Sequence, residues 1–454
     1  MAFPSPTSEP AAQIFIIPVP VMPSPNTAKR PLFWMLPMIA MLGLASCSRT
    51  DDGPRDGIWR AVLQVPGGEL PFGIEFVREQ GGRVAYLING PERTRINEIA
   101  VNGDAVTLRM PGFNNRIDAK LEGDTLSGTL LMVKPKDKDQ QIPFRARYGD
   151  AFRFGPGAEG PAESGAPDVS GRWAVTFVDS GKNTPAIGEL KQTGRLVTGT
   201  FLTPTGDHRF LAGELRGREL RLSKFDGGHV FLYHGTLAAD DTLAGQFWSG
   251  IAFEDRFTAR RDENASLGDA DQATKLVSGD RFDFRFPDLG GVNVSLRDQF
   301  FKGKVVVVAL AGSWCPNCHD EAQLLVDLHE RNRARGFEVV SLMFEQFGDF
   351  ERAAEATYRF RERYGIEYTT LIAGISDKDD AATRLPQLNG VFAFPTTIFI
   401  DRGGKVRKIH TGFAGPATGE HHAKMVREFE RTVDGLLAEP KPDLPPTEPS
   451  IPKV

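Results

Sequence analysis

The chain has 454 residues, which is too long for one ordinary domain, so two or three domains are expected. With 40% apolar residues, 25% charged residues and a net charge of −5, its composition is that of a globular protein. Basic and acidic residues are interspersed along the chain, so a nucleic-acid partner is not expected. The three cysteines are too few for a disulfide framework, which means that each of them needs its own explanation.

The N-terminal region has the pattern of an export signal. Lys29 and Arg30 precede an apolar run of 15 residues, 31–45, which ends in small residues. This order is typical of a secretory signal, and the run is shorter than the roughly 20 residues of a membrane-spanning helix. An uncleaved anchor is the alternative. The Pro-rich stretch before Lys29 is unusual for a signal, so we expect Met22 to be the natural start.

The end of this run, LASC at 44–47, resembles the lipobox of bacterial lipoproteins, in which the cysteine becomes the lipidated first residue. The resemblance implies a signal over 1–46 and a lipidated tether over 47–56 that is anchored in the membrane through Cys47. We therefore expect a protein of the bacterial cell envelope that faces the periplasm. Ser48, directly after the cysteine, resembles the pattern of outer-membrane lipoproteins.

From residue 57 to about 260, short alternating strands are broken by Gly, Asn-Gly and Asp pairs, which predicts antiparallel β structure in a barrel or a sandwich. The pattern repeats: GIWRAVLQV at 57 returns as GRWAVTFVD at 171, and EGDTLSGTLL at 122 returns as ADDTLAGQFW at 239. The nearly constant offset indicates a duplicated β domain. The predicted copies cover 57–154 and 170–262, and a Gly/Pro/Ser-rich linker, 155–169, separates them.

Trp59 and Trp173 open the first strand of each copy, and we expect them to be core residues rather than ligand contacts. The three histidines of this region do not have the spacing of metal ligands, so they are expected to be surface or hydrogen-bonded residues.

A polar linker, 263–278, leads to a region in which apolar strand runs alternate with helical segments. The runs include VVVVALAG, FEVVSLMF and TTIFID. Continuous apolar strands between helices predict an α/β domain with a buried sheet over 279–438. The remaining Pro-rich residues, 439–454, are expected to be disordered.

The motif CPNCH at 315–319 is compatible with a redox dithiol, a c-type haem attachment site or half of a zinc site. The valine-rich run ends just before Cys315, and Pro316 is suited to the first turn of a helix. Cys315 is therefore predicted at a helix N-terminus, where the helix dipole and free N–H groups stabilise a thiolate. Cys318 follows one turn later, in position to resolve a mixed disulfide.

The two alternatives fit the surroundings less well. Zinc needs four ligands, and the chain has no second cysteine pair, while His421 and His422 point to different faces of a helix. A haem would require His319 as an iron ligand within a helical cytochrome pattern. We therefore expect neither a metal nor another cofactor, and His319 is predicted to lie on the helix surface beside the dithiol.

A strand, WCPNC and a helix, followed about 80 residues later by FPTT and another strand, resemble the thioredoxin fold. Residues 279–437 resemble its TlpA/ResA-like branch, the envelope-anchored thiol–disulfide oxidoreductases, whose lead-in is similar to FDFRFPDLGGVNVSLRDQFFKGKVVVV.

The resemblance implies roles for single residues. Cys315 matches the attacking cysteine and Cys318 the resolving one, and together they would form the redox-active disulfide. Glu321 stands where this branch keeps a carboxylate that helps to move the proton of the buried cysteine, whereas the buried Asp of other thioredoxins is replaced by Ala309. Pro395 matches the cis-proline that holds the substrate chain. The substrate is implied to lie against Trp314, Pro316, Phe394 and Pro395.

The resemblance further implies a reductase of protein disulfides that is recharged by a membrane electron donor of the thiol-reducing type. The sequence departs from the branch in two places: ALAGSWC lacks the usual aromatic pair, and Pro-Asn is an unusual dipeptide between the cysteines. The dipeptide helps to set the reduction potential, which spans about −270 to about −120 mV among relatives, so the direction of electron flow stays open. A second hypothesis is a binding or scaffold lipoprotein in which the β domains bind a partner and the dithiol is secondary.

Overall fold

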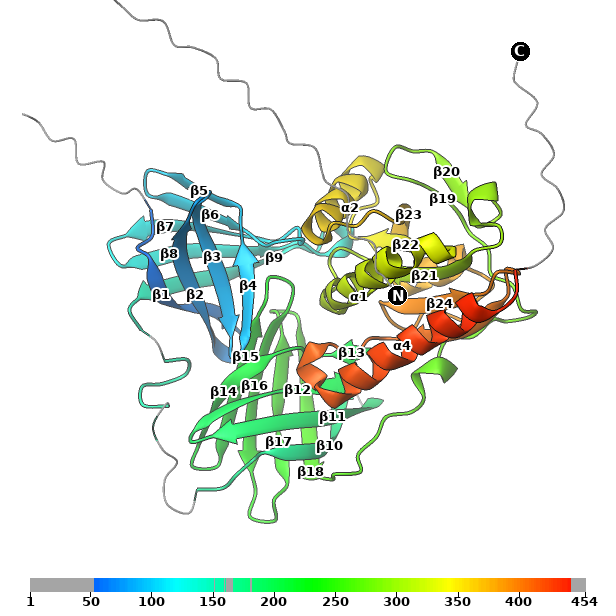
Figure 1. Ribbon diagram of the computed structural model, residues 1–454. Coiled ribbons are helices and arrows are strands. Elements are labelled where there is room, and N and C mark those ends of the chain that lie inside the picture. Colours follow the sequence, from blue (N-terminus) through cyan, green and yellow to red (C-terminus); the bar gives the residue numbers. More distant parts are fainter. Residues whose placement is uncertain (1–52, 151, 159, 161–165, 180–181, 442–454) are drawn as a thin grey trace, which may run out of the picture. The chain divides into compact units, whose positions relative to one another are not determined.

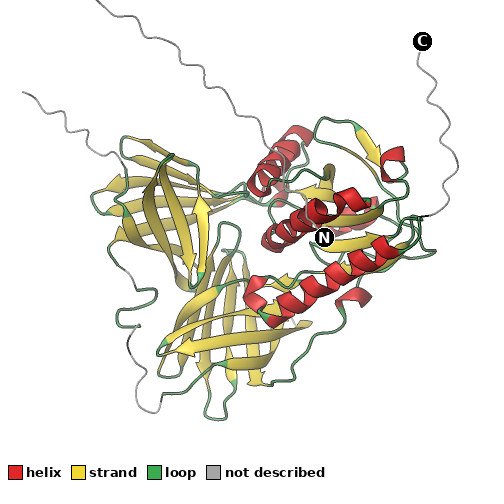
Figure 2. Ribbon diagram, in the orientation of Figure 1, coloured by secondary structure: helices red, strands yellow, loops and turns green. Residues whose placement is uncertain are grey.

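The computed structural model describes residues 53–150, 152–158, 160, 166–179 and 182–441 (Figure 1). The predicted signal, the lipidation site at Cys47 and most of the Pro-rich tail lie outside these residues. None of the helices in the described part is long and apolar enough to cross a membrane. Two antiparallel sheets are followed along the chain by a mixed sheet that is accompanied by helices (Figure 2).

The first β domain is a nine-stranded sheet in the order β4-β3-β2-β1-β9-β8-β7-β6-β5. Its strands alternate buried apolar residues with more exposed ones, as expected for a sheet that covers a core on one face. The strands are β1 (Gly57–Val65), β2 (Gly68–Glu79), β3 (Gly82–Asn89), β4 (Glu92–Ile96), β5 (Ile99–Asn102), β6 (Ala105–Arg109), β7 (Arg116–Glu122), β8 (Thr125–Met132) and β9 (Gln140–Tyr148). A short 3-10 turn, Pro135–Asp137, precedes β9.

The second β domain closes into a barrel, because β11 pairs with both β10 and β12. Closure removes the free edges that an open sheet would present to other chains. The strands are β10 (Gly171–Asp179), β11 (Lys182–Thr193), β12 (Leu196–Thr203), β13 (Gly206–Asp207), β14 (Leu211–Arg216), β15 (Glu219–Phe225), β16 (Val230–Leu237), β17 (Leu243–Ser249) and β18 (Phe253–Arg261).

The two predicted tryptophan anchors occupy equivalent places in these domains. Trp59 and Trp173 are both fully buried. In each case the indole Nε1 donates a hydrogen bond to the carbonyl four residues earlier, Arg55 at 2.9 Å and Val169 at 3.0 Å. The prediction of two tandem antiparallel β domains is confirmed, and their form is barrel-like.

The C-terminal domain has a five-stranded sheet in the order β23-β22-β21-β24-β25, in which β21, β22 and β23 pair in parallel and β24 pairs antiparallel with both β21 and β25. Every residue of β21 and β22 is buried, and one apolar core joins the sheet to four helices. The predicted α/β domain is thus confirmed. Its elements are β19 (Arg285–Pro287), β20 (Asn293–Ser295), β21 (Val305–Ala311), α1 (Pro316–Asn332), β22 (Phe337–Glu345), α2 (Phe350–Tyr364), β23 (Thr369–Ile375), α3 (Lys378–Arg384), β24 (Thr396–Ile400), β25 (Val406–Thr411) and α4 (Glu420–Ala438).

The segment between β18 and β19, residues 262–284, joins the second barrel to the α/β domain. It is held against β25 by Asp271, whose carboxylate pairs with Lys408 at 3.0 Å and with His410 at 2.8 Å.

Candidate active site

Cys315 lies where strand β21 is followed by helix α1. It is the N-cap residue of α1, and Pro316 occupies the first helical position, where its missing N–H costs no hydrogen bond. The Sγ of Cys315 accepts a hydrogen bond from the backbone N–H of Cys318 at 3.2 Å, and the two cysteines are joined by a disulfide. After reduction, the same N–H and the helix dipole would stabilise a thiolate at Cys315.

The short loop before Cys315 is fixed by the end of β22. Ser313 donates hydrogen bonds from its backbone N (2.9 Å) and its Oγ (2.7 Å) to the buried carboxylate of Glu345. The indole Nε1 of Trp314 donates to the carbonyl of Phe344 at 2.8 Å. A side chain at Gly312 would collide with that carbonyl, since a Cβ there would lie 2.7 Å from it. The backbone therefore approaches β22 too closely for any residue but glycine.

The peptide bond between Phe394 and Pro395 lies beside the disulfide and is cis. The carbonyl oxygen of Phe394 is 3.3 Å from the Sγ of Cys315. The ring of Trp314 packs edge-on against that of Phe394, with ring centroids 5.7 Å apart. The structure thus brings the predicted residues Trp314, Phe394 and Pro395 together around Cys315.

Glu321 lies one turn beyond Cys318 on α1, and only 1% of it is exposed. Its carboxylate accepts a hydrogen bond from the hydroxyl of Thr397, which is the residue opposite Ala309 in the pairing of β21 with β24. Burial raises the pKa of Glu321 to about 7, although the bond from Thr397 lowers it. At neutral pH this carboxyl group can therefore either accept or release a proton.

The prediction that His319 is a surface residue is wrong, because only 2% of it is exposed. Its ring stacks on Phe113 of the first β domain, and its two nitrogens contact Tyr364 Oη and the carbonyl of Ser313, both at 2.7 Å. Burial lowers the pKa of His319 to about 3, so the ring is neutral. Among the described residues, no group of three or more His, Cys, Asp or Glu is placed to hold a metal ion.

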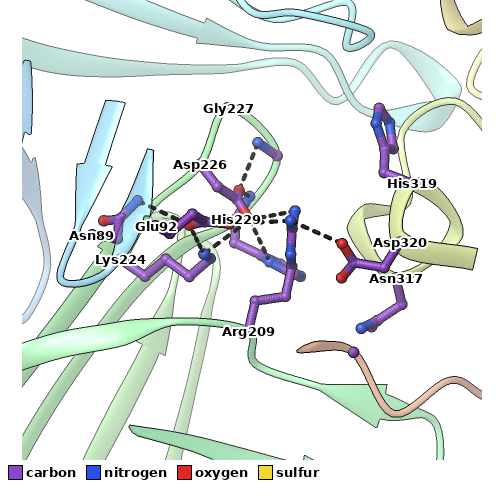
Figure 3. A network of polar contacts seen from close by, with 12 residues as sticks. Asn89, Glu92, Arg209, Lys224, Asp226, Gly227, His229, Asn317, His319 and Asp320 are labelled. Carbon is purple, nitrogen blue, oxygen red and sulfur yellow. Dashed lines mark hydrogen bonds and ion pairs between the residues drawn. The ribbon is translucent and has the colours of Figure 1, made fainter. Parts of the chain in front are cut away.

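Asp320 is a buried residue of the site that sequence reasoning missed (Figure 3). Its carboxylate pairs at 3.0 Å with Arg209 of the second β domain, which also contacts Glu92 at 3.1 Å and Asp226 at 3.2 Å. Lys224 completes this network through Glu92 at 2.6 Å and Asp226 at 3.3 Å. Burial raises the pKa of Asp320 to about 7, against the effect of Arg209. No sequence pattern indicated the pair, because its two residues are 111 positions apart.

Comparisons with known proteins match the C-terminal part of the chain. The model of the Redoxin family matches residues 277–424. Thiol-disulfide oxidoreductase ResA of Geobacillus thermodenitrificans is 29% identical over 145 residues, which are 32% of this chain and 75% of that protein. The protein of the same name from Halalkalibacterium halodurans is 26% identical over 143 residues, 32% of this chain and 73% of its own. Among solved structures, a thiol:disulfide interchange protein, thioredoxin family protein, of Chlorobium tepidum TLS covers 36% of this chain and 99% of its own, with 19% identity and a TM-score of 0.28.

The family match covers the region that contains the Cys315–Cys318 disulfide and the cis peptide bond before Pro395. Sequence similarity and site geometry therefore agree on the chemistry of this region. The C-terminal domain is thioredoxin-like and similar to the Redoxin family, and the protein is a thiol–disulfide oxidoreductase.

Proposed function

We propose that this thiol–disulfide oxidoreductase is a reductase of protein disulfides that works in the bacterial cell envelope. The observation that carries the proposal is the arrangement at the start of α1. There, a disulfide at a helix N-terminus faces a cis peptide bond, and a buried carboxyl group with a pKa of about 7, that of Glu321, follows on the same helix. The direction of electron flow is the one that the resemblance to the TlpA/ResA-like branch implies.

In the proposed cycle the Cys315 thiolate attacks one sulfur of a substrate disulfide, which forms a mixed disulfide and releases one substrate thiolate. Cys318 then passes its proton to the carboxylate of Glu321 and attacks the Sγ of Cys315. This second exchange releases the other substrate thiolate and closes the Cys315–Cys318 disulfide, so two electrons have moved to the substrate. A thiol-reducing membrane donor restores the dithiol by the same exchange in reverse.

We assign the binding of the substrate chain to Trp314, Pro316, Phe394 and Pro395. Trp314 and Phe394 pack against each other beside Cys315. Pro316 opens helix α1, and Pro395 follows the cis peptide bond.

The reduction potential of the Cys315–Cys318 couple is expected to lie nearer to the about −270 mV of thioredoxin than to the about −120 mV of the oxidant DsbA. Equilibration with dithiothreitol or glutathione buffers, followed by mass-spectrometric counting of free thiols, measures it. The protein should also reduce insulin when glutathione supplies the electrons. A potential above about −180 mV, or no turnover with both cysteines intact, would contradict the reductase proposal.

We also propose that Cys47 carries the lipid anchor and that the protein is retained at the outer membrane. The support is the LASC pattern at the end of a basic and apolar signal-like segment. In a bacterial host, an alkyne-tagged fatty acid should label the protein, and Cys47→Ala should lose the label. Fractionation of the membranes then locates the labelled protein. Equal labelling of both forms would rule out this anchor.

A further inference from the structure

Both β domains contact the helix turn that carries the disulfide. Every residue from 315 to 322 is buried, and only 4% of Cys315 is exposed. Four residues of the turn are each covered by a different β-domain residue. Phe113 of the first domain stacks on His319 with ring centroids 4.1 Å apart. In the second domain, Asp207 accepts a hydrogen bond from Asn317 Nδ2 at 2.8 Å, and Arg209 pairs with Asp320 at 3.0 Å. Gly228, also of the second domain, lies against Pro316.

Two equivalent loops of the β domains meet at this turn. The loop between β6 and β7 carries Phe113, and the corresponding loop of the second domain, between β15 and β16, carries Gly228. The loops are joined by a hydrogen bond of 2.7 Å from Asn115 Nδ2 to the carbonyl of Gly227. A Cβ at Gly228 would lie 2.6 Å from the ring of Phe113 and 2.8 Å from the ring of Pro316. Gly228 therefore lies where the two loops and helix α1 approach too closely for a side chain.

The contacts across this boundary can separate without leaving the buried cation of the β domains unpaired. When Asp320 is withdrawn, Arg209 keeps two carboxylate partners within the β domains, Glu92 and Asp226 (Figure 3). Farther out, the boundary includes an exposed ion pair between Lys136 and Asp377 at 2.5 Å. Polar contacts of this kind are typical of interfaces between domains that move relative to each other.

Disulfide exchange requires the substrate sulfur to reach the Sγ of Cys315, and a polypeptide brings bulky chain on both sides of its cysteine. Since only 4% of Cys315 is exposed, a polypeptide disulfide has little room to reach that sulfur. We propose that the β domains form a releasable cover over the dithiol, so that polypeptide disulfides reach Cys315 only after the cover has separated from α1. This inference rests on the proposed function and adds the regulation of the same site.

A wedge at the loop contact tests the cover without changing any residue of the α/β domain. Gly228→Leu should push the loop off Pro316, whereas Gly81→Leu, at a turn where a Cβ would meet nothing within 4 Å, is the matched control. In chains with Cys47→Ala, the reduced proteins are treated with iodoacetamide or with a maleimide attached to a 5-kDa polymer. Polymer labelling of Cys315 and insulin turnover should both rise about tenfold in Gly228→Leu, as expected if the open fraction rises by that factor. Labelling by iodoacetamide and reduction of a small aromatic disulfide should change about twofold or less.

If Gly228→Leu does not fold, a second variant still tests the proposal. Lys136→Glu faces Asp377 with a like charge at an exposed position and should raise polymer labelling about two- to threefold. The cover is refuted if the wild-type protein already reacts with the polymer as fast as both variants do. If the labelling differences appear but no form reduces insulin or the small disulfide, the cover stands and the proposed function fails.

Discussion

Replacing Cys318 with Ser is expected to stop turnover and to leave substrate proteins attached to the chain through Cys315. Cys315 lies at the N-terminus of α1 and can still form the mixed disulfide, but no thiol remains to resolve it. Insulin reduction should fall by about 1000-fold or more, because catalytic groups that act as a unit lose nearly the whole effect when one is removed. The adducts are separated from envelope extracts on non-reducing gels, identified by mass spectrometry and released by dithiothreitol.

Cys315→Ser is the matched control, since it removes the attacking thiol and should accumulate no adducts. Adducts on Cys315→Ser but not on Cys318→Ser would reverse the two roles. If neither variant accumulates adducts, and envelope partners bind a variant lacking both cysteines as well as they bind the wild type, the scaffold hypothesis gains.

Glu321→Gln should make the protein slower and, above neutral pH, more stable. Burial raises the pKa of Glu321 from 4.5 to about 7, so the folded state holds the proton more tightly than the unfolded chain does. The free energy of unfolding therefore decreases as the pH rises from about 4.5 to about 7, by on the order of 3 kcal/mol in all. The glutamine side chain carries no charge, so the variant should gain about this amount at pH 8 and nothing at pH 4, less any cost of an unpaired amide N–H.

Hydrogen exchange of the β21 and β24 amides at both pH values measures this change within the C-terminal domain. Turnover near neutral pH should fall about 100-fold, because the carboxylate no longer accepts the proton of Cys318. Glu330→Gln, at an exposed position of the same helix, is the control and should change neither quantity. If Glu321→Gln loses stability at pH 8, or if its turnover is unchanged, Glu321 does not accept the proton of Cys318 as proposed.

The features that the sequence predicted are those that neighbouring residues determine. Four consecutive valines make a strand that is buried on both faces, and Pro316 can begin a helix but not continue one, so the position of Cys315 between them follows from local rules. Trp59 and Trp173 were predicted as core residues for a similar reason, since each opens an alternating strand at the start of its repeat.

His319 and Asp320 are different, because each is also covered by a residue from another domain. On an isolated helix both would be expected to face water, and charged residues are rarely buried without a partner. Those partners, Phe113 and Arg209, lie on irregular segments between strands. Contacts between loops of separate domains leave no periodic pattern in a sequence, so only the folded chain brings them together.

The segment of residues 262–284 makes the contact between the β domains and α1 an intramolecular one. After the β domains separate from α1, they stay tethered to the dithiol domain. Their effective concentration is then on the order of millimolar for a short linker. A free substrate at micromolar concentration competes poorly with the tethered β domains for access to α1. Efficient substrates would then be those that also bind a barrel, or that share the same membrane surface, so that proximity as well as disulfide chemistry decides which proteins are reduced.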